Sequence, residues 1–367
     1  MSKGRNRVTI VDIANRAGVS FKTVSRVLNA NSNVSAELRQ RVERVMRELD
    51  YRPNLAARSL RGNRAFAIGL LIGPLGLDQD GTGGSQNSAP PTFFMSLQAG
   101  AIMACRSAGY QLTIESVDLR SKRLASELAQ QFRNLRVDGV LLCPPLVDMT
   151  LVTETLTELG TPFVQILPGR PSANSPSLFI DDRGAAEAMT RRLIQAGHRR
   201  IGFISGPPAH VAASKRQAGF LKAMAAHESC EPQVLDGNFT FDSGMRAGLD
   251  LLTAPSRPSA IFAANDDMAA GVLAAAMRLG LKVPDDLSVA GFDDSLVATL
   301  VWPPLTTVRQ PIVKMAQVAV EHLVRAAGEE ESMEPAVIEM PYEIVERQSA
   351  RLGKASAGTN RDRFRGP

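Results

Sequence analysis

Apolar residues near the N-terminus recur with the spacing of two short amphipathic helices. Ile10–Ala17 carries them at every third or fourth position, and Thr9 with Asp12 can cap the start of this helix. Gly18 follows, where a left-handed backbone ends a helix, and Ser20 can cap a second helix. The inner face of the second helix is apolar, and its outward residues are Phe21, Lys22, Ser25 and Arg26. The spacing is typical of a helix-turn-helix.

After residue 65 the pattern changes to short apolar runs separated by helix-length segments, which indicates parallel βαβ units. The runs predict strands at 65–72, 110–117, 137–143, 161–167, 177–180, 199–205, 259–265 and 287–293. Several runs are apolar on both faces, as in a sheet covered by helices on each side. Since one sheet of that many strands is less favourable than two, we predict an all-α headpiece followed by two doubly wound parallel-sheet α/β lobes with a cleft between them.

Positive charge is concentrated beside the helix-turn-helix. Residues 1–64 hold 14 Lys/Arg and 5 Asp/Glu, whereas the remaining residues hold 28 and 32. Such an excess is what contact with a phosphate backbone requires, and an ordinary pair of amphipathic helices does not need it. The sequence therefore predicts binding to double-stranded DNA.

Composition excludes several other classes of protein. No uninterrupted apolar run of about 18 residues and no signal-peptide pattern occurs, so we expect no membrane partner. Cys105, Cys143 and Cys230 lack metal-ligand spacing and are expected to be reduced and buried. No cofactor motif and no catalytic constellation is recognisable, and we assign no chemistry to the histidines, His198, His210, His227 and His322.

Three segments in this order resemble the DNA-binding headpiece of the lactose-repressor (LacI/GalR) family of bacterial regulators: TVSRVLN (Thr23–Asn29), VSAELRQRV (Val34–Val42) and LDYRPNLAARSLRG (Leu49–Gly62). The resemblance implies a third helix from about residue 35 to 49 and a hinge helix at about 54–62. We expect the headpiece at 1–64, a two-lobed effector-binding and dimerisation core of periplasmic-binding-protein type at 65–348, and a disordered tail at 349–367.

The family resemblance also implies three crossovers between the lobes, near 179–181, 308–311 and 338–341. The chain departs from the family pattern in two places. Gly73–Pro91 is longer and richer in glycine than the usual turn, and its spacing matches neither nucleotide-binding fingerprint, so we expect a flexible loop. Thr92 stands where many members have proline before the paired aromatic residues Phe93 and Phe94.

Arg26 is the first candidate for reading DNA, because a guanidinium can pair with both acceptors on a guanine edge. The resemblance gives it that role, and contact with phosphate is the alternative. Phe21 is expected to contact a thymine methyl group, and Lys22 can donate to guanine. Ser25 completes the outward face. Donors that position the DNA backbone are Thr9, Ser20, Thr23 and Asn33.

The expected hinge helix is too short to be stable alone in water, so it should fold only on DNA. Asn54 can cap it. The resemblance implies that two hinges of a homodimer pack through Ala57 and wedge Leu60 between base pairs of the minor groove.

Three polar residues follow predicted strands where doubly wound sheets bind ligands: Arg216, Asn265 and Asp293. By resemblance they bond effector hydroxyls or a carboxylate, Phe239 stacks on the effector, and Phe94 faces it. A helix cap is the alternative for Asp293, and a core position is the alternative for Phe239. Asp266 and Asp267 are expected to cap the next helix, whereas Asp181 and Asp182 stay open between crossover and pocket.

Together these features predict a cytoplasmic, nucleoid-associated bacterial repressor of a carbohydrate catabolic operon, a homodimer on operator DNA that a sugar-type effector releases. One alternative is a regulator that needs a nucleobase as corepressor. Another is a sugar-binding protein with no regulatory role, which the headpiece disfavours.

Overall fold

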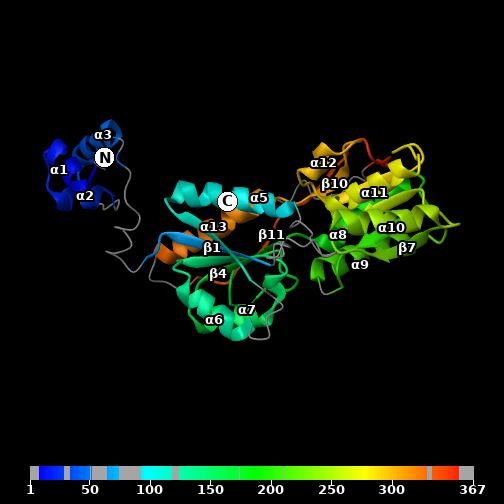
Figure 1. Cartoon of the computed structure of the whole chain (residues 1–367), viewed down its shortest axis with the longest axis horizontal. Helices are drawn as coiled ribbons and strands as arrows, with labels where there is room; N and C mark the ends of the chain where they lie inside the picture. Colours follow the sequence, from blue (N-terminus) through cyan, green and yellow to red (C-terminus); the bar gives the residue numbers. More distant parts are fainter. Residues whose placement is uncertain are drawn as a thin grey trace, which may run out of the picture. The chain divides into compact units, whose positions relative to one another are not determined.

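The computed structural model describes residues 8–28, 34–49, 51, 64–73, 92–117, 124–172, 174–208, 210–328 and 333–354. Contacts divide the chain into two units, with the boundary between Phe66 and Ala67. Within the described residues, the first unit carries three helices, α1 (Ile10–Ala17), α2 (Phe21–Leu28) and α3 (Ala36–Glu48) (Figure 1). Among the described helices, none has an apolar stretch that could cross a membrane.

Local chemistry accounts for the helix boundaries of the first unit. Thr9 accepts a hydrogen bond from Asp12 N, and the Asp12 carboxylate accepts one from Thr9 N at 2.7 Å, so both form a capping box. Gly18 ends α1 with φ of 62°, and Thr23 N donates to Ser20 Oγ at the start of α2. The helices bury one core: Ile13, Ala14, Ala17, Val24, Val27, Val34, Val42 and Val45. The predicted helix-turn-helix is confirmed.

The second unit contains two six-stranded sheets, each the centre of one lobe. In the first lobe the sheet order is β11-β5-β4-β3-β1-β2, and all of its pairings are parallel. Its strands are β1 (Ala67–Ile72), β2 (Gln111–Ser116), β3 (Gly139–Leu142), β4 (Phe163–Ile166), β5 (Ser177–Phe179) and β11 (Val337–Glu339). Its helices are α5 (Phe93–Ala108), α6 (Leu124–Asn134), the short η1 (Leu146–Asp148), α7 (Thr150–Glu158) and α13 (Ile312–Gly328).

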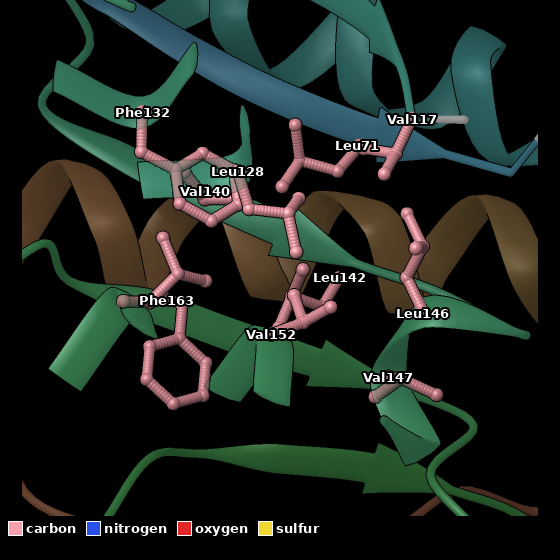
Figure 2. Close-up of a cluster of buried hydrophobic side chains, with 11 residues drawn as sticks. Leu71, Val117, Leu128, Phe132, Val140, Leu142, Leu146, Val147, Val152 and Phe163 are labelled. Atoms are coloured by element: carbon pink, nitrogen blue, oxygen red, sulfur yellow. The ribbon is translucent and has the colours of Figure 1, made fainter. Parts of the chain in front are cut away.

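Helices α5 and α13 pack together on one face of the first-lobe sheet, and α6 and α7 lie on the other (Figure 1). Figure 2 shows the core on the α6 and α7 side, where Leu71, Val140 and Leu142 of the sheet meet Leu128 and Phe132 of α6. The apolar side chains along both faces of β1 and β3 are therefore buried, as the sequence pattern predicted.

The second lobe has the sheet order β12-β10-β9-β8-β6-β7, with only the edge strand β12 antiparallel. Its strands are β6 (Arg200–Ser205), β7 (Glu231–Asp236), β8 (Ala260–Ala263), β9 (Ser288–Asp293), β10 (Thr306–Arg309) and β12 (Glu343–Val345). Its helices are α8 (Asp182–Gln195), α9 (Val211–Ala225), α10 (Phe241–Thr253), α11 (Asp266–Arg278) and α12 (Val297–Leu300). The predicted fold class, with two doubly wound lobes, is confirmed.

The chain passes between the two sheets after β5, after β10 and between β11 and β12. These passages lie at or next to the three predicted crossovers. The sequence pattern did not predict four of the observed strands: β7, β10, β11 and β12. Of these, β7, β11 and β12 lie at sheet edges with partly exposed side chains, and β10 (TTVR) contains a single apolar residue. Neither situation produces an apolar run.

Residues 349–353, which we expected to belong to a disordered tail, pack against the second lobe. Ser349 is completely buried, donates to Val289 O at 2.6 Å and accepts from Thr306 N. Arg351 N donates to Ser288 Oγ, and Gly353 N donates to Arg192 O. These polar residues are ordered because strands and helices that are distant in the sequence supply their hydrogen-bond partners.

Candidate functional site

The exposed face of α2 carries the residues expected to read DNA. Val24 and Val27 turn into the core, so Phe21, Lys22 and Arg26 lie on the outer side of the helix. Neither Lys22 nor Arg26 forms an ion pair with a carboxylate of the described residues. These two cations are therefore available to a phosphate or a base edge.

Local hydrogen bonds hold the polar residues around this face. The hydroxyl groups of Ser20 and Thr23 lie 2.9 Å apart, and the Thr9 hydroxyl donates to Asp12 at 2.7 Å. The Thr9 contacts lower the pKa of the Asp12 carboxyl. Four predicted DNA contacts, Asn33, Asn54, Ala57 and Leu60, lie outside the described residues, and so does the Gly73–Pro91 insertion apart from Gly73 itself.

Arg216 is the centre of a buried polar cluster in the second lobe. It lies on α9 with 4% of its surface exposed. Its Nε donates to Asp182 Oδ1 at 2.7 Å, and its Nη1 donates to Ala264 O at 2.7 Å and to Asp293 Oδ1 at 3.5 Å. The guanidinium also stacks on Phe292, 3.7 Å from the ring centroid. Its Nη2 makes no hydrogen bond to the described residues, so one donor is left for a ligand.

Asp293 lies at the carboxyl end of β9 with φ of 118°, a backbone conformation that L-residues rarely adopt. Gln310 Nε2 donates to its Oδ1 at 2.7 Å, while Oδ2 bonds to none of the described residues. Gln310 Oε1 is buried without a partner among them. Burial raises the pKa of the Asp293 carboxyl to about 7, although Arg216 and Gln310 act in the opposite direction. Burial therefore favours the protonated form of this carboxyl.

Asn265 and Phe239 contact each other directly. Asn265 Nδ2 donates to Phe239 O at 3.0 Å, and Asn265 Oδ1 accepts from Met268 N, which caps α11. Phe239 has φ of 67°, so the amide supports a strained backbone. The structure therefore brings four predicted residues, Arg216, Phe239, Asn265 and Asp293, to the carboxyl ends of β6 to β9 or to the helices that follow them. Phe94 belongs to the other lobe, where its ring packs 4.3 Å from Phe93.

His210, to which we assigned no chemistry, belongs to the same cluster. Its ring meets Phe239 edge to face at 4.9 Å, and its Nδ1 is buried without a partner among the described residues. Burial, with the positive charge of Arg216, lowers the pKa of His210 to about 4, so the ring is neutral at neutral pH. Its position one residue before α9, after the end of β6, was the only signal in the sequence.

The acidic residues around the cluster play other roles than we expected. Asn265 caps α11, so the prediction that Asp266 and Asp267 would do so was wrong. Asp266 is fully buried, accepts from Thr307 Oγ1 and Ser295 N, and has a pKa well above the usual value because of burial. Asp181 caps α8, whereas Asp182 is the buried partner of Arg216. The sequence left these two open, and the tertiary structure separates them.

The other candidate sites among the described residues lie outside this cluster. A surface depression of about 400 Å³ lies against α6 and shares no residue with this cluster; it is lined by Glu115, Glu127, Gln130, Gln131, Asn134 and Leu135. Within the described ranges, no group of His, Cys, Asp and Glu is arranged to hold a metal ion. Cys105 and Cys143 are free and buried, and Cys230 is free and partly exposed.

Similarity to known proteins identifies the family. The family described as "Bacterial regulatory proteins, lacI family" matches residues 9–54, and a periplasmic binding protein-like domain matches residues 190–350. The HTH-type transcriptional regulator CelR of Thermobifida fusca is 35% identical over 354 residues, which cover 94% of this chain and 99% of that protein. The chain belongs to the lacI family of bacterial regulatory proteins.

Solved structures of lacI-family proteins agree with this assignment. The complex of the transcriptional regulator CelR with cellobiose matches with a TM-score of 0.66 and 32% identity, covering 94% of this chain and all of that one. The lac repressor dimer bound to operator and the anti-inducer ONPF matches with a TM-score of 0.70 and 27% identity, covering 94% and 99%. This lacI-family chain is thus a DNA-binding transcriptional regulator and not an enzyme.

Proposed function

We propose that this lacI-family regulator represses a carbohydrate catabolic operon and leaves its operator when a sugar-type effector binds the cluster around Arg216. It would act in the bacterial cytoplasm, on the nucleoid. The observation that carries the proposal is the pair of unused groups on Arg216 and Asp293, one donor and one acceptor, in the cluster whose His210 packs against the ring of Phe239. Adjacent hydroxyl groups of a sugar can satisfy both, and an aromatic ring can cover its apolar face.

The similarity to the CelR–cellobiose complex makes cellobiose the first compound to test. Thermal unfolding of the full chain with cellobiose, glucose, ribose, gluconate and hypoxanthine distinguishes the alternatives, because a ligand that binds the native state stabilises it. We expect a rise in Tm with a neutral sugar. A rise with hypoxanthine alone would replace this proposal by corepression through a nucleobase.

An Asp293→Asn variant tests the effector site. It keeps the size of the side chain and removes the carboxylate, so stabilisation by the active sugar should weaken by at least about tenfold in concentration. Arg278 lies at the end of α11, and Arg278→Gln is the control that should respond like the parent protein. Equal responses of the parent and Asp293→Asn would remove Asp293 from the effector site.

The test of operator binding uses DNA fragments that the full chain selects from a genomic pool. The selected operator should be released as the active sugar is added, because a ligand shifts an equilibrium by its differential affinity for the two states. Retention of the operator at every sugar concentration would contradict induction. Tighter binding with added ligand would establish corepression.

We further propose that the regulator binds its operator as a homodimer, as the lac repressor does in its operator complex. Three strongly exposed apolar side chains of the second lobe support an interface with a second copy: Trp302 (82%), Met277 (77%) and Leu300 (72%). They lie on or next to α11 and α12, which contact each other. Trp302→Asp should convert a dimer to a monomer in sedimentation, whereas Leu221→Asp on α9 should not. A dimeric Trp302→Asp protein would place the interface elsewhere.

A further inference from the structure

Thr92, the position at which this chain departs from the family proline, contacts the opposite lobe. Its backbone N and its Oγ1 both donate to Asp267 Oδ2, at 3.3 and 3.2 Å. Thr92 lies at the start of α5 in the first lobe, and Asp267 lies in the first turn of α11 in the second lobe. These hydrogen bonds therefore join segments that are 175 residues apart in the chain.

The orientation of Thr92 is unusual for a residue that precedes a helix. Threonine at this position ordinarily caps its own helix by accepting from a backbone amide. Here Thr92 forms no side-chain cap of α5, and its hydroxyl donates to the opposite lobe instead. The carboxylate of Asp267 thus lies beside the N-termini of two helices, α5 and α11, where the partial positive charge of each helix favours an anion.

The same carboxylate oxygen also contacts the candidate effector site. Asn265 Nδ2 donates to Asp267 Oδ2 at 3.3 Å, in addition to its bond to Phe239 O. Three donors from two lobes therefore converge on one oxygen atom. Separation of the lobes would remove both Thr92 donors and leave Asp267 with donors of its own lobe, among them Asn265 Nδ2.

We propose that Thr92 and Asp267 form an interlobe latch that holds the cleft of this regulator closed. Both donors come from the single threonine, and proline has neither a backbone N–H nor a hydroxyl group. The latch is therefore a property of the residue at position 92. It sets the closed fraction of the core independently of which effector binds, and it scales the apparent affinity of any ligand that needs the closed state.

Substitutions at Thr92 separate the latch from the integrity of α5. Thr92 has φ of −63°, a value that proline adopts, and the first residues of a helix do not need their N–H groups. Thr92→Pro therefore removes both donors without breaking the helix. Thr92→Ser keeps both donors and is the matched control, while Thr92→Val keeps the N–H and removes the hydroxyl group.

The test measures the distance between the lobes in the full chain by pulsed electron spin resonance. Spin labels are attached at Ser107→Cys in the first lobe and Asp250→Cys in the second, both exposed positions. Cys230 is replaced by serine, whereas Cys105 and Cys143 stay in place because burial raises the pKa of their thiols to about 11 and about 12, which suppresses labelling. An excess of unlabelled chain keeps distances between subunits out of the measurement.

We expect the parent and Thr92→Ser to give the same short distance. Thr92→Pro should raise the ratio of open to closed molecules by at least about tenfold, and Thr92→Val should lie between them. Asp267→Ala removes the acceptor, so it should open the cleft as Thr92→Pro does, and the double variant should open it no further, because both remove the same interaction. Superimposable distances for the parent, Thr92→Pro and Asp267→Ala would overturn the latch. If Thr92→Pro fails to fold, Thr92→Val and Asp267→Ala decide the question alone.

Discussion

Arg216 donates from Nε to Asp182 Oδ1 at 2.7 Å, and both side chains are about 95% buried. Asp182 begins α8, directly after the first passage of the chain from one lobe to the other. The guanidinium that is expected to bind the effector is therefore also the neutralising partner of a buried carboxylate. Removing Arg216 will change the stability of the second lobe as well as ligand binding.

Arg216→Ala should lower the free energy of unfolding by about 3–5 kcal/mol, because Asp182 would remain buried without its partner. The matched control is Arg351→Ala, which breaks the exposed pair with Asp285 and should cost about 1 kcal/mol or less. Urea denaturation of the full chain measures both. Equal losses for the two variants would show that the buried pair contributes no more than a surface pair.

Asp293 should make stability depend on pH. Burial raises the pKa of its carboxyl from 3.8 to about 7, so the native state keeps a proton that the unfolded chain releases above about pH 4. The stabilising contribution is complete below the unfolded pKa and is lost as the pH rises through about 7. Between pH 5 and 8, we therefore expect Asp293→Asn to gain stability relative to the parent protein. A difference that is constant with pH, measured by urea denaturation, would exclude a shifted carboxyl at this position.

Arg26→Ala should weaken binding to the selected operator by about 1–3 kcal/mol per half-site while leaving most binding to random DNA. The headpiece keeps its other basic residues, which supply the salt-dependent contact with phosphate. Titration of operator and random DNA at one salt concentration measures the difference. If both lose affinity equally, Arg26 contacts phosphate and not a base.

Gly244→Ala should destabilise the second lobe, because a Cβ atom there would lie 2.2 Å from Met268 O on α11. Gly248, one turn further along α10, has its nearest neighbour at 3.2 Å, the Ala275 Cβ atom. Both substitutions gain the same helix propensity, so their difference isolates the close approach of α10 and α11. We expect Gly244→Ala to be about 2 kcal/mol less stable than Gly248→Ala in urea. Similar stabilities would mean that the helices separate without cost.

The sequence by itself determined the elements whose signals are local. Helices α1 and α2 are recognisable because their caps, Thr9 and Ser20, and the terminating Gly18 act within one turn of the residues they cap. Buried strands such as β1 are recognisable because both of their faces must be apolar. Candidate site residues could be proposed from strand ends, since the carboxyl ends of parallel strands meet at one edge.

Only the tertiary structure decided which polar residues are partners. Arg216 meets Asp182 across 34 residues of sequence and Asp293 across 77, and Thr92 meets Asp267 across 175. The sequence left Asp182 open between crossover and pocket, gave His210 no chemistry, and took Asp267 for a helix cap although Asn265 supplies that cap. Local periodicity reports which side of an element is buried. A buried polar group, by contrast, is stabilised by whichever complementary group the fold brings within hydrogen-bond distance, and that depends on how strands far apart in the chain are arranged in the sheet.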